Sequence, residues 1–447
     1  MLVILLALLT TAYFWGKRDL LSPWFLLCLA ILASYLIVLL NYNNWDVKIN
    51  GTFVLYITTA LISFGIGAFV VKIFSPSKLV TATHLERVSL KKELPSKRYP
   101  EIFFIVVSVI AAVLYCWKVL SDVGGSGSIS ERIRHIYDSV VGGYSPGFVF
   151  NQCLELTFAI AYINVYRLFQ EIYSRCRVIS ILNLLIPILV FIVVIMVSSD
   201  RNIFLRFAIY FICLFVLFFR ENSKKRNVNK SIVFKVSILL LILVIIFFLL
   251  GKSKQYSSGI FKSVSIYGGS GLYDFNLWIA DFDQSLLHGQ STFSVFITMF
   301  NSIFGRFGFV LPNANIDRID EFIEFSASNG YVFSSNIYTA LRPYVEDFGY
   351  FGVILFPFII GMFYQWLFVK MKKSKYGYNW ILYCMLIYPI VFFPILEQLI
   401  RRFHLGFIYE IAWVAIVYHL VYGNKVVRIQ EMGTAKQVTK TAQNGGV

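Results

Sequence analysis

The sequence predicts an all-α protein that crosses a membrane many times. Of its 447 residues, 58% are hydrophobic and only 14% are charged, whereas soluble domains carry about 25% charged residues. The aromatic residues, 18% of the chain, are spread along it, and apolar runs of membrane-spanning length recur from end to end. These observations exclude a soluble domain with a single hydrophobic anchor.

About eleven apolar runs approach the roughly 20 residues that a transmembrane helix needs. The first is short, but no basic segment precedes it and no small-x-small cleavage site follows, so we interpret it as a retained span and not as a signal peptide. The runs cover approximately residues 1–15, 22–40, 51–73, 101–120, 148–166, 178–198, 202–220, 232–250, 348–369, 379–396 and 403–422.

The basic residues predict the orientation of these spans. The loops after the odd-numbered spans, together with the C-terminal tail, hold 26 of the 40 Lys and Arg residues, and the other loops hold about 12. Because basic loops are retained in the cytoplasm, we expect a periplasmic N-terminus and a cytoplasmic C-terminus. Most of the net charge of +16 is then a consequence of topology, and nucleic acid is not an expected partner.

One loop, 251–347, is far longer than the others and falls on the external side. Its segment FSVFITMFNSIFGRFGF interrupts Phe and Ile with Asn, Gly and Arg, a pattern that favours short amphipathic helices on the membrane surface; re-entrant segments are the alternative. We therefore expect a bundle of about eight spans (1–250), this loop (251–347), about three further spans (348–422) and a disordered tail (423–447).

Ionisable residues inside the spans indicate a polar region toward the outer face. Glu155, Glu410 and Arg206 all fall in the outer halves of their predicted spans. Charges at such depth are costly, so they usually pair or face a hydrated cavity. The alternatives are a structural pair between Arg206 and one of the glutamates, or a site for a lipid headgroup.

Arginines at the outer ends of the spans suit phosphate, because their planar fork matches its oxygens. They are Arg201, Arg342, Arg401 and Arg402. For Arg401 an alternative is an ion pair with Glu397 along a helix surface, since the two are four residues apart.

Several familiar site motifs are absent or uninformative. The sequence has no G-x-x-x-x-G-K-[ST] and no H-E-x-x-H, and its five histidines show no metal-ligand spacing. The pair Asp281 and Asp283 matches D-x-D, which occurs by chance too often to carry weight. YGGSG (267–271) favours a tight turn over a phosphate cradle. We expect neither a cofactor nor a metal.

Three segments together are characteristic. SNIYTALRPYVEDFGYFGVILFPFIIG (335–361) leads from the long loop into the membrane, SSDRNIFLRF (198–207) joins two spans, and YGGSGLYDFNLWI (267–279) places Asp274 after glycines. In these segments, and in length and span number, the chain resembles the Wzy-type oligosaccharide repeat-unit polymerases that build O-antigen and capsule. In the first segment the likeness is carried by Asn336, Tyr338, Thr339, Arg342, Asp347, Phe348, Gly349 and Gly352.

The resemblance implies a GT-C-like bundle in the cell inner membrane and a glycosyltransferase of lipopolysaccharide or capsule synthesis. Such an enzyme moves a glycan from undecaprenyl diphosphate onto another lipid-linked repeat unit, without nucleotide or metal, among membrane lipids and beside a chain-length-regulating co-polymerase. We expect the diphosphate and substrate to be bound by Arg201, Arg342, Arg401, Arg402, Arg206, Tyr338 and Asn336.

Candidates for the base are Asp347, Glu346 and His404, with Asp347 first because of its place in the motif. The alternative for Asp347 is a helix cap without a chemical role.

Two other functions are weighed against the polymerase. An O-antigen ligase uses the same diphosphate chemistry. A flippase or other transporter of lipid-linked oligosaccharide is less favoured, because the loop lengths are uneven and the two halves show no inverted repeat.

Overall fold

The computed structural model contains two compact units, which we describe separately. The first comprises Met1–Leu94 and Leu205–His404, and the second comprises Pro95–Phe204 and Leu405–Val447. The described residues are 1–75, 99–125, 129–141, 143–174, 178–198, 201–222, 231–232, 234–238, 260–282, 285–312, 322–326, 329–374 and 376–423.

The described residues form an overwhelmingly helical, multi-pass membrane protein, as the sequence predicts. Among the described residues, eight helices are long and apolar enough to cross a membrane. Their spans are Pro23–Leu40, Gly51–Phe74, Glu101–Val123, Phe148–Tyr173, Ile181–Ser198, Asn202–Glu221, Leu341–Lys373 and Leu405–Gly423.

The other three predicted spans differ. The run 1–15 forms a helix of only 14 residues, α1 (Leu2–Trp15). The run 379–396 is divided at Ile387 into α16 (Tyr378–Leu386) and α17 (Tyr388–Phe392), because Pro389 lacks the N–H that a continuous helix requires. Most of the run 232–250 lies outside the described residues.

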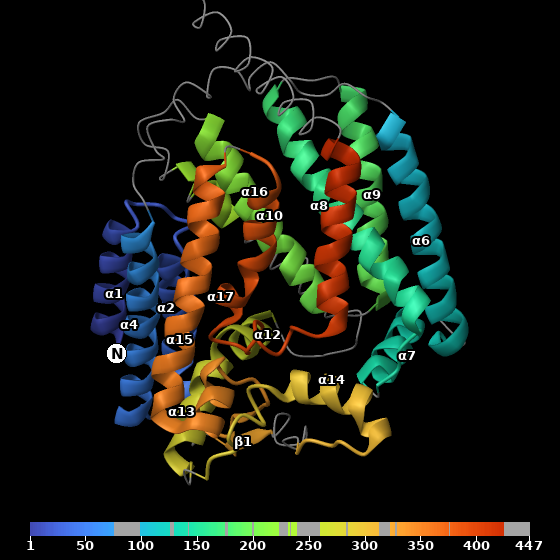
Figure 1. Ribbon diagram of the computed structural model, residues 1–447. Helices are drawn as coiled ribbons and strands as arrows, with labels where there is room; N and C mark the ends of the chain where they lie inside the picture. Colours follow the sequence, from blue (N-terminus) through green and yellow to red (C-terminus); the bar gives the residue numbers. More distant parts are fainter. Residues whose placement is uncertain are drawn as a thin grey trace, which may run out of the picture. The chain divides into compact units, whose positions relative to one another are not determined.

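The first unit is built around two helices in close contact, α4 (Gly51–Phe74) and α15 (Leu341–Lys373), which lie side by side in Figure 1. A Cβ on Gly67 would stand 2.1 Å from the carbonyl oxygen of Phe358, and one on Gly361 would stand 2.2 Å from that of Phe64. Small residues therefore let the two backbones approach, as is common between membrane helices.

The remaining long helices of this unit are α2 (Pro23–Leu40) and most of α10 (Arg201–Asn222), with the short α3 (Tyr42–Trp45) after α2. At one end of the unit Asp19 accepts from Arg220 at 2.6 Å and from Lys372. Lys72 donates to the carbonyl of Trp15 at 3.0 Å. These contacts thus link the ends of four helices, or the residues just beyond them.

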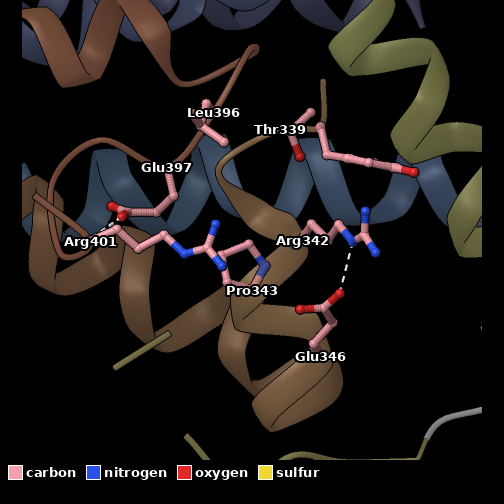
Figure 2. A pocket seen from close by; sticks show the side chains of 8 residues that line it. Thr339, Arg342, Pro343, Glu346, Leu396, Glu397 and Arg401 are labelled. Carbon is pink, nitrogen blue, oxygen red and sulfur yellow. Dashed lines mark hydrogen bonds and ion pairs between the residues drawn. The ribbon is translucent and has the colours of Figure 1, made fainter. Parts of the chain in front are cut away.

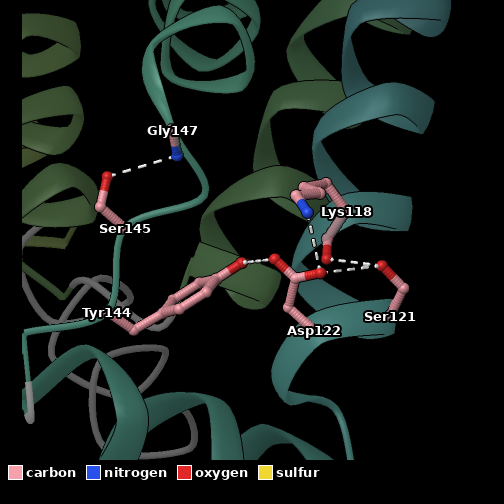
Figure 3. A network of polar contacts seen from close by, with 6 residues as sticks. All are labelled: Lys118, Ser121, Asp122, Tyr144, Ser145 and Gly147. Atoms are coloured by element: carbon pink, nitrogen blue, oxygen red, sulfur yellow. Dashed lines mark hydrogen bonds and ion pairs between the residues drawn. The ribbon is translucent and has the colours of Figure 1, made fainter.

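The second unit packs three long helices against one another, α6 (Tyr99–Val123), α8 (Phe148–Ser174) and α9 (Val178–Ser198), with α7 (Ile129–Val141) and the helix Leu405–Gly423. A buried ion pair of 2.8 Å joins Arg167 to Glu101. Figure 3 shows a second polar network, in which Asp122 accepts from Lys118 and from the Tyr144 hydroxyl, both at 2.9 Å.

The described part of the long loop 251–347 is folded. It contains α12 (Ile260–Ser265), the π-helix η3 (Ile266–Ser270), α13 (Gly271–Asp281), α14 (Ser294–Phe304), the 3-10 turn η4 (Gly305–Phe307) and an antiparallel hairpin of β1 (Ile323–Ser326) and β2 (Val332–Ser335). The hairpin pairs Ile323 with Ser335 and Ser326 with Val332. This small sheet departs from the all-α prediction.

The glycine-rich segment 267–271 was expected to form a tight turn, and this expectation is wrong. It lies in η3 and the start of α13, as part of one continuous helical stretch. The glycines serve close packing, since a Cβ on Gly269 would stand 2.7 Å from Ile37 and one on Gly271 would stand 2.3 Å from the carbonyl oxygen of Pro394.

Helix α15 begins seven residues before the predicted span and is broken at Gly349. This residue has φ 58° and ψ −143°, a conformation that is accessible to glycine and strained for other residues. After the break, a Cβ on Gly352 would stand 2.1 Å from the carbonyl oxygen of Tyr344. The two glycines of DFGYFG therefore let the segment 341–348 fold closely onto the spanning part of α15.

Candidate functional site

The candidate site is a pocket in the first unit with an empty volume of about 260 Å³, solvent at its mouth included. Figure 2 shows its side chains, which come from the N-terminal part of α15, the residues just before it and the stretch 396–401 after α17. We call it the arginine pocket, and its lining is Tyr338, Thr339, Arg342, Pro343, Glu346, Leu396, Glu397 and Arg401.

Arg342 is held firmly in this pocket. Its Nε donates to Oε1 of Glu346 at 2.8 Å, and both side chains are buried. The guanidinium carbon lies 3.8 Å from the ring centroid of Tyr338 and 5.3 Å from that of Trp278 on α13. Because cation–π contacts gain strength when they are desolvated, these rings help to hold the guanidinium in place. Its position is therefore set by two elements, α13 and α15.

Arg401 reaches the same pocket from another stretch of the chain. Burial lowers the pKa of its guanidinium, an effect that Glu397 and Glu346 oppose. Its Nε has no hydrogen-bond partner among the described residues. Arg401 is half-buried, but its Nε is inaccessible. A guanidinium with such an unused donor is suited to an anionic ligand, because the ligand would satisfy a costly unpaired group.

The alternative for Arg401, an ion pair with Glu397 along a helix surface, is not what the structure has. The stretch 396–404 is not helical. The carboxylate of Glu397 instead accepts backbone N–H groups of Leu399, Ile400 and Arg401 at 2.8–2.9 Å, and the hydroxyl of Tyr344 at 3.1 Å. Glu397 therefore shapes the turn that carries Arg401.

Asp347 is fully buried and does not line the arginine pocket. Its two oxygens accept the backbone N–H groups of Ser291 at 3.0 Å and Thr292 at 2.5 Å. The neighbouring Glu346 accepts the Ser291 hydroxyl at 2.5 Å. The two carboxylates thus tie the residues before α14 to the start of α15. Asp347 lies inside α15, so it caps the turn before α14 and not its own helix.

Two further predicted arginines converge on another ring. The guanidinium carbon of Arg206 lies 5.0 Å from the ring centroid of Tyr388, and that of Arg402 lies 5.6 Å from it. Arg206 is buried although it lies within α10. Glu155 and Glu410, the partners considered for Arg206 from the sequence, belong to the second unit, so their pairing with Arg206 stays a prediction.

Two other predicted site residues, Asn336 and His404, do not line the arginine pocket. Asn336 is half-buried between β2 and α15, and His404 is exposed just before the last described helix. Arg201 is the first residue of α10, and its side chain lies outside the part of the chain that the structure describes.

Asp274 on α13 was noted in the sequence but not chosen as a site residue. Its side chain is fully buried, and burial raises its pKa well above the usual value, although Ser335, Ser270 and Arg342 act in the opposite direction. The Ser270 and Ser335 hydroxyls hydrogen-bond to each other at 3.0 Å. A buried carboxyl group with a raised pKa thus lies near Arg342. Its position after the glycine-rich segment was the signal available from the sequence.

The fold and the pocket together define a multi-pass helical membrane protein in which the buried Arg342, the half-buried Arg401 and two buried glutamates line one pocket. Within the described residues no group of three or more His, Cys, Asp or Glu side chains could hold a metal ion. No protein-family model, curated protein or solved structure matches the chain.

Proposed function

We propose that this protein is a membrane glycosyltransferase of the Wzy type, which polymerises a surface polysaccharide from polyprenyl-diphosphate-linked repeat units. One observation carries the proposal: the buried Arg342 and the partly buried Arg401, from two separate segments, line one pocket with Glu346. Glu346 pairs with Arg342 at 2.8 Å and opposes the lowering of the Arg401 pKa that burial causes. The resemblance of the segment 335–361 to that family supports the same function.

The pocket suits the leaving group of such a reaction. The oxygen of the acceptor hydroxyl bonds to the anomeric carbon, and the bond from that carbon to the diphosphate oxygen breaks, with its electron pair passing to the diphosphate. Guanidinium groups that bind the departing diphosphate stabilise the charge that develops in the transition state. Arg342 and Arg401 take this role in the proposal, with Arg206, Arg402 and Arg201 as further cationic residues and Tyr338 and Asn336 beside them.

Glu346 is the best placed of the three proposed bases. It lines the pocket, whereas Asp347 is sequestered by two backbone N–H groups and His404 is exposed. In the proposal Glu346 leaves Arg342 when the diphosphate binds and then accepts the proton of the attacking hydroxyl. In the proposal Asp347 has a positioning role. It accepts the backbone N–H groups of Ser291 and Thr292, and the Ser291 hydroxyl donates to Glu346.

The proposal includes the finer topology expected from the sequence. About eleven spans, a periplasmic N-terminus and a cytoplasmic C-terminus place the loop 251–347, and with it the arginine pocket, at the outer face of the inner membrane. The donor and the acceptor are then undecaprenyl-diphosphate-linked repeat units, and a chain-length-regulating co-polymerase is a further partner.

The direct test is a reaction of the purified protein with lipid-linked repeat unit, without added nucleotide. We expect products with several repeat units and release of the polyprenyl diphosphate. Arg342→Lys should be strongly impaired, whereas Arg306→Lys, a matched change at an exposed arginine, should not. If folded wild-type protein forms no glycosidic bond between repeat units, the proposal is wrong.

A deletion strain distinguishes the related functions. A single repeat unit on core lipid indicates a polymerase. Polymer that stays on its carrier indicates the ligase, and repeat units retained on the cytoplasmic face indicate a flippase.

A further inference from the structure

The segment 293–312 exposes an unusual amount of apolar surface for a loop region. Phe307, Phe309 and Val310 are 73%, 65% and 70% exposed, and no residue in the segment is acidic. The other exposed large apolar side chains in the segment are Phe293, Phe296, Ile303, Phe304 and Leu311. Exposed apolar side chains that gather in one segment are typical of a binding surface.

Helix α14, which forms most of this segment, has two distinct faces. At 100° per residue, its polar side chains Ser294, Thr298, Asn301 and Ser302 fall on one side, and the Phe and Ile residues fall on the other. The apolar side is not buried, because Phe296, Ile303 and Phe304 are 41–53% exposed. In a helix that packs on a protein core the apolar side would be covered.

The residues after α14 extend the same surface. The Asn301 side chain donates to the carbonyl of Leu311 at 2.9 Å and accepts its N–H at 2.8 Å. Gly308 makes the turn with φ 84°, a conformation that favours glycine. The loop is therefore closed by its own hydrogen bonds, and Phe307, Phe309 and Val310 form its exposed tip.

The position of α14 within the first unit places this surface near the end of the spans. The ring of Phe293, which precedes α14, lies 6.0 Å from that of Phe356, seven residues or about 10 Å beyond the break at Gly349. In Figure 1, α14 runs across the direction of α4 and α15. A helix that crosses the spans near their end is oriented as a helix on a membrane surface would be.

We propose that the segment 293–312 binds the phospholipid surface of the membrane, with the apolar side of α14 and the tip 307–310 inserted below the headgroups. Amphipathic helices of this kind insert by about 5–10 Å. The hydrogen bonds from Ser291 and Thr292 to Asp347 then connect the anchor to the start of α15. The anchor holds the residues beside the arginine pocket at the membrane surface, whatever ligand the pocket takes.

Fluorescence quenching in lipid nanodiscs tests this proposal without any activity assay. An environment-sensitive fluorophore is attached to Val310→Cys at the tip or, as the matched control, to Ser302→Cys on the polar side of α14, in full-length protein without its other cysteines. A lipid with a nitroxide near the headgroup end of its acyl chain should quench the fluorophore at 310 severalfold more than that at 302. Equal quenching would overturn the proposal.

A second measurement uses the wild-type protein, so that it does not depend on the variants folding. Phospholipid with a photoreactive group near its headgroup should cross-link to peptides from 293–312. Cross-links absent from these peptides, or formed only with a polyprenyl lipid, would contradict a phospholipid anchor. Protein–protein cross-links through the same peptides would indicate that a second copy covers the surface, and would contradict it equally.

Discussion

Replacing Gly349 with alanine is expected to destabilise the protein by strain alone. At φ 58° and ψ −143° a residue with a Cβ is held outside its favoured regions. The nearest atom to an added Cβ is Leu286 Cδ2 at 3.7 Å, which is an ordinary contact. The cost is therefore conformational, about 1–3 kcal/mol of the free energy of unfolding.

Gly352→Ala should be more damaging than Gly349→Ala. Its Cβ would stand 2.1 Å from the carbonyl oxygen of Tyr344, so the segment 341–348 must move away from the spanning part of α15. That segment carries Arg342 and Glu346, and we expect this variant to disturb the arginine pocket as well as stability.

The assay is reversible unfolding of purified protein in mixed micelles, with Gly51→Ala as the control. Gly51 is the first residue of α4, has no atom within 4 Å of an added Cβ and does not have a positive φ. If Gly349→Ala proves as stable as Gly51→Ala, the break in α15 is not required and our account of the DFGYFG motif is wrong.

Three carboxylate variants give further predictions. Asp347→Asn keeps one acceptor oxygen for two backbone N–H donors, so it should lose about 1–3 kcal/mol of unfolding free energy. Burial raises the pKa of Asp274, so the free energy of unfolding of the wild type falls as the pH rises above the pKa that Asp274 has in the unfolded chain. Asparagine does not titrate, so the stability of Asp274→Asn relative to the wild type should increase by up to about 1.4 kcal/mol per pH unit. Burial raises the pKa of Asp19, but Lys372 and Arg220 outweigh it and lower the pKa overall. Its contribution is therefore present at neutral pH and lost on acidification, and Asp19→Asn should destabilise by about 1–3 kcal/mol at pH 7.

Denaturation at several pH values checks all three. An Asp347→Asn protein of unchanged stability but without activity would favour the base over the positioning role. If the stability of Asp274→Asn relative to the wild type does not increase with pH, the pKa of Asp274 is not raised in the folded protein. For Asp19→Asn, stability equal to that of the wild type at pH 7 would contradict the ion-pair account.

The class of fold could be predicted from the sequence because hydrophobicity over a membrane span is a local signal. Eight of the predicted runs are span-length helices for that reason. The run 379–396 was predicted as one span from its length and hydrophobicity alone. The structure divides it because Pro389 interrupts the helix. The hairpin β1–β2 was missed because two four-residue strands have almost no periodic signal.

The site was predictable only where a residue type carries its own chemistry. Arg342 and Arg401 were chosen as phosphate ligands, and the structure brings them into one pocket. The four-residue spacing of Glu397 and Arg401 suggested an ion pair along a helix, and this alternative is wrong because the chain is not helical there. The contacts of Asp347 with Ser291 and Thr292 join residues more than 50 positions apart, and no local pattern reports such pairs.

The central claim is that the arginine pocket binds a polyprenyl diphosphate, and equilibrium binding to the protein in nanodiscs tests it most directly. Undecaprenyl diphosphate should bind the wild type far more tightly than undecaprenol does. Arg342→Lys and Arg401→Lys should each weaken that binding by about 10-fold or more, because charge-assisted hydrogen bonds of about 1.5–3 kcal/mol are impaired. If both folded variants bind the diphosphate as tightly as the wild type does, the diphosphate site lies elsewhere and the account fails.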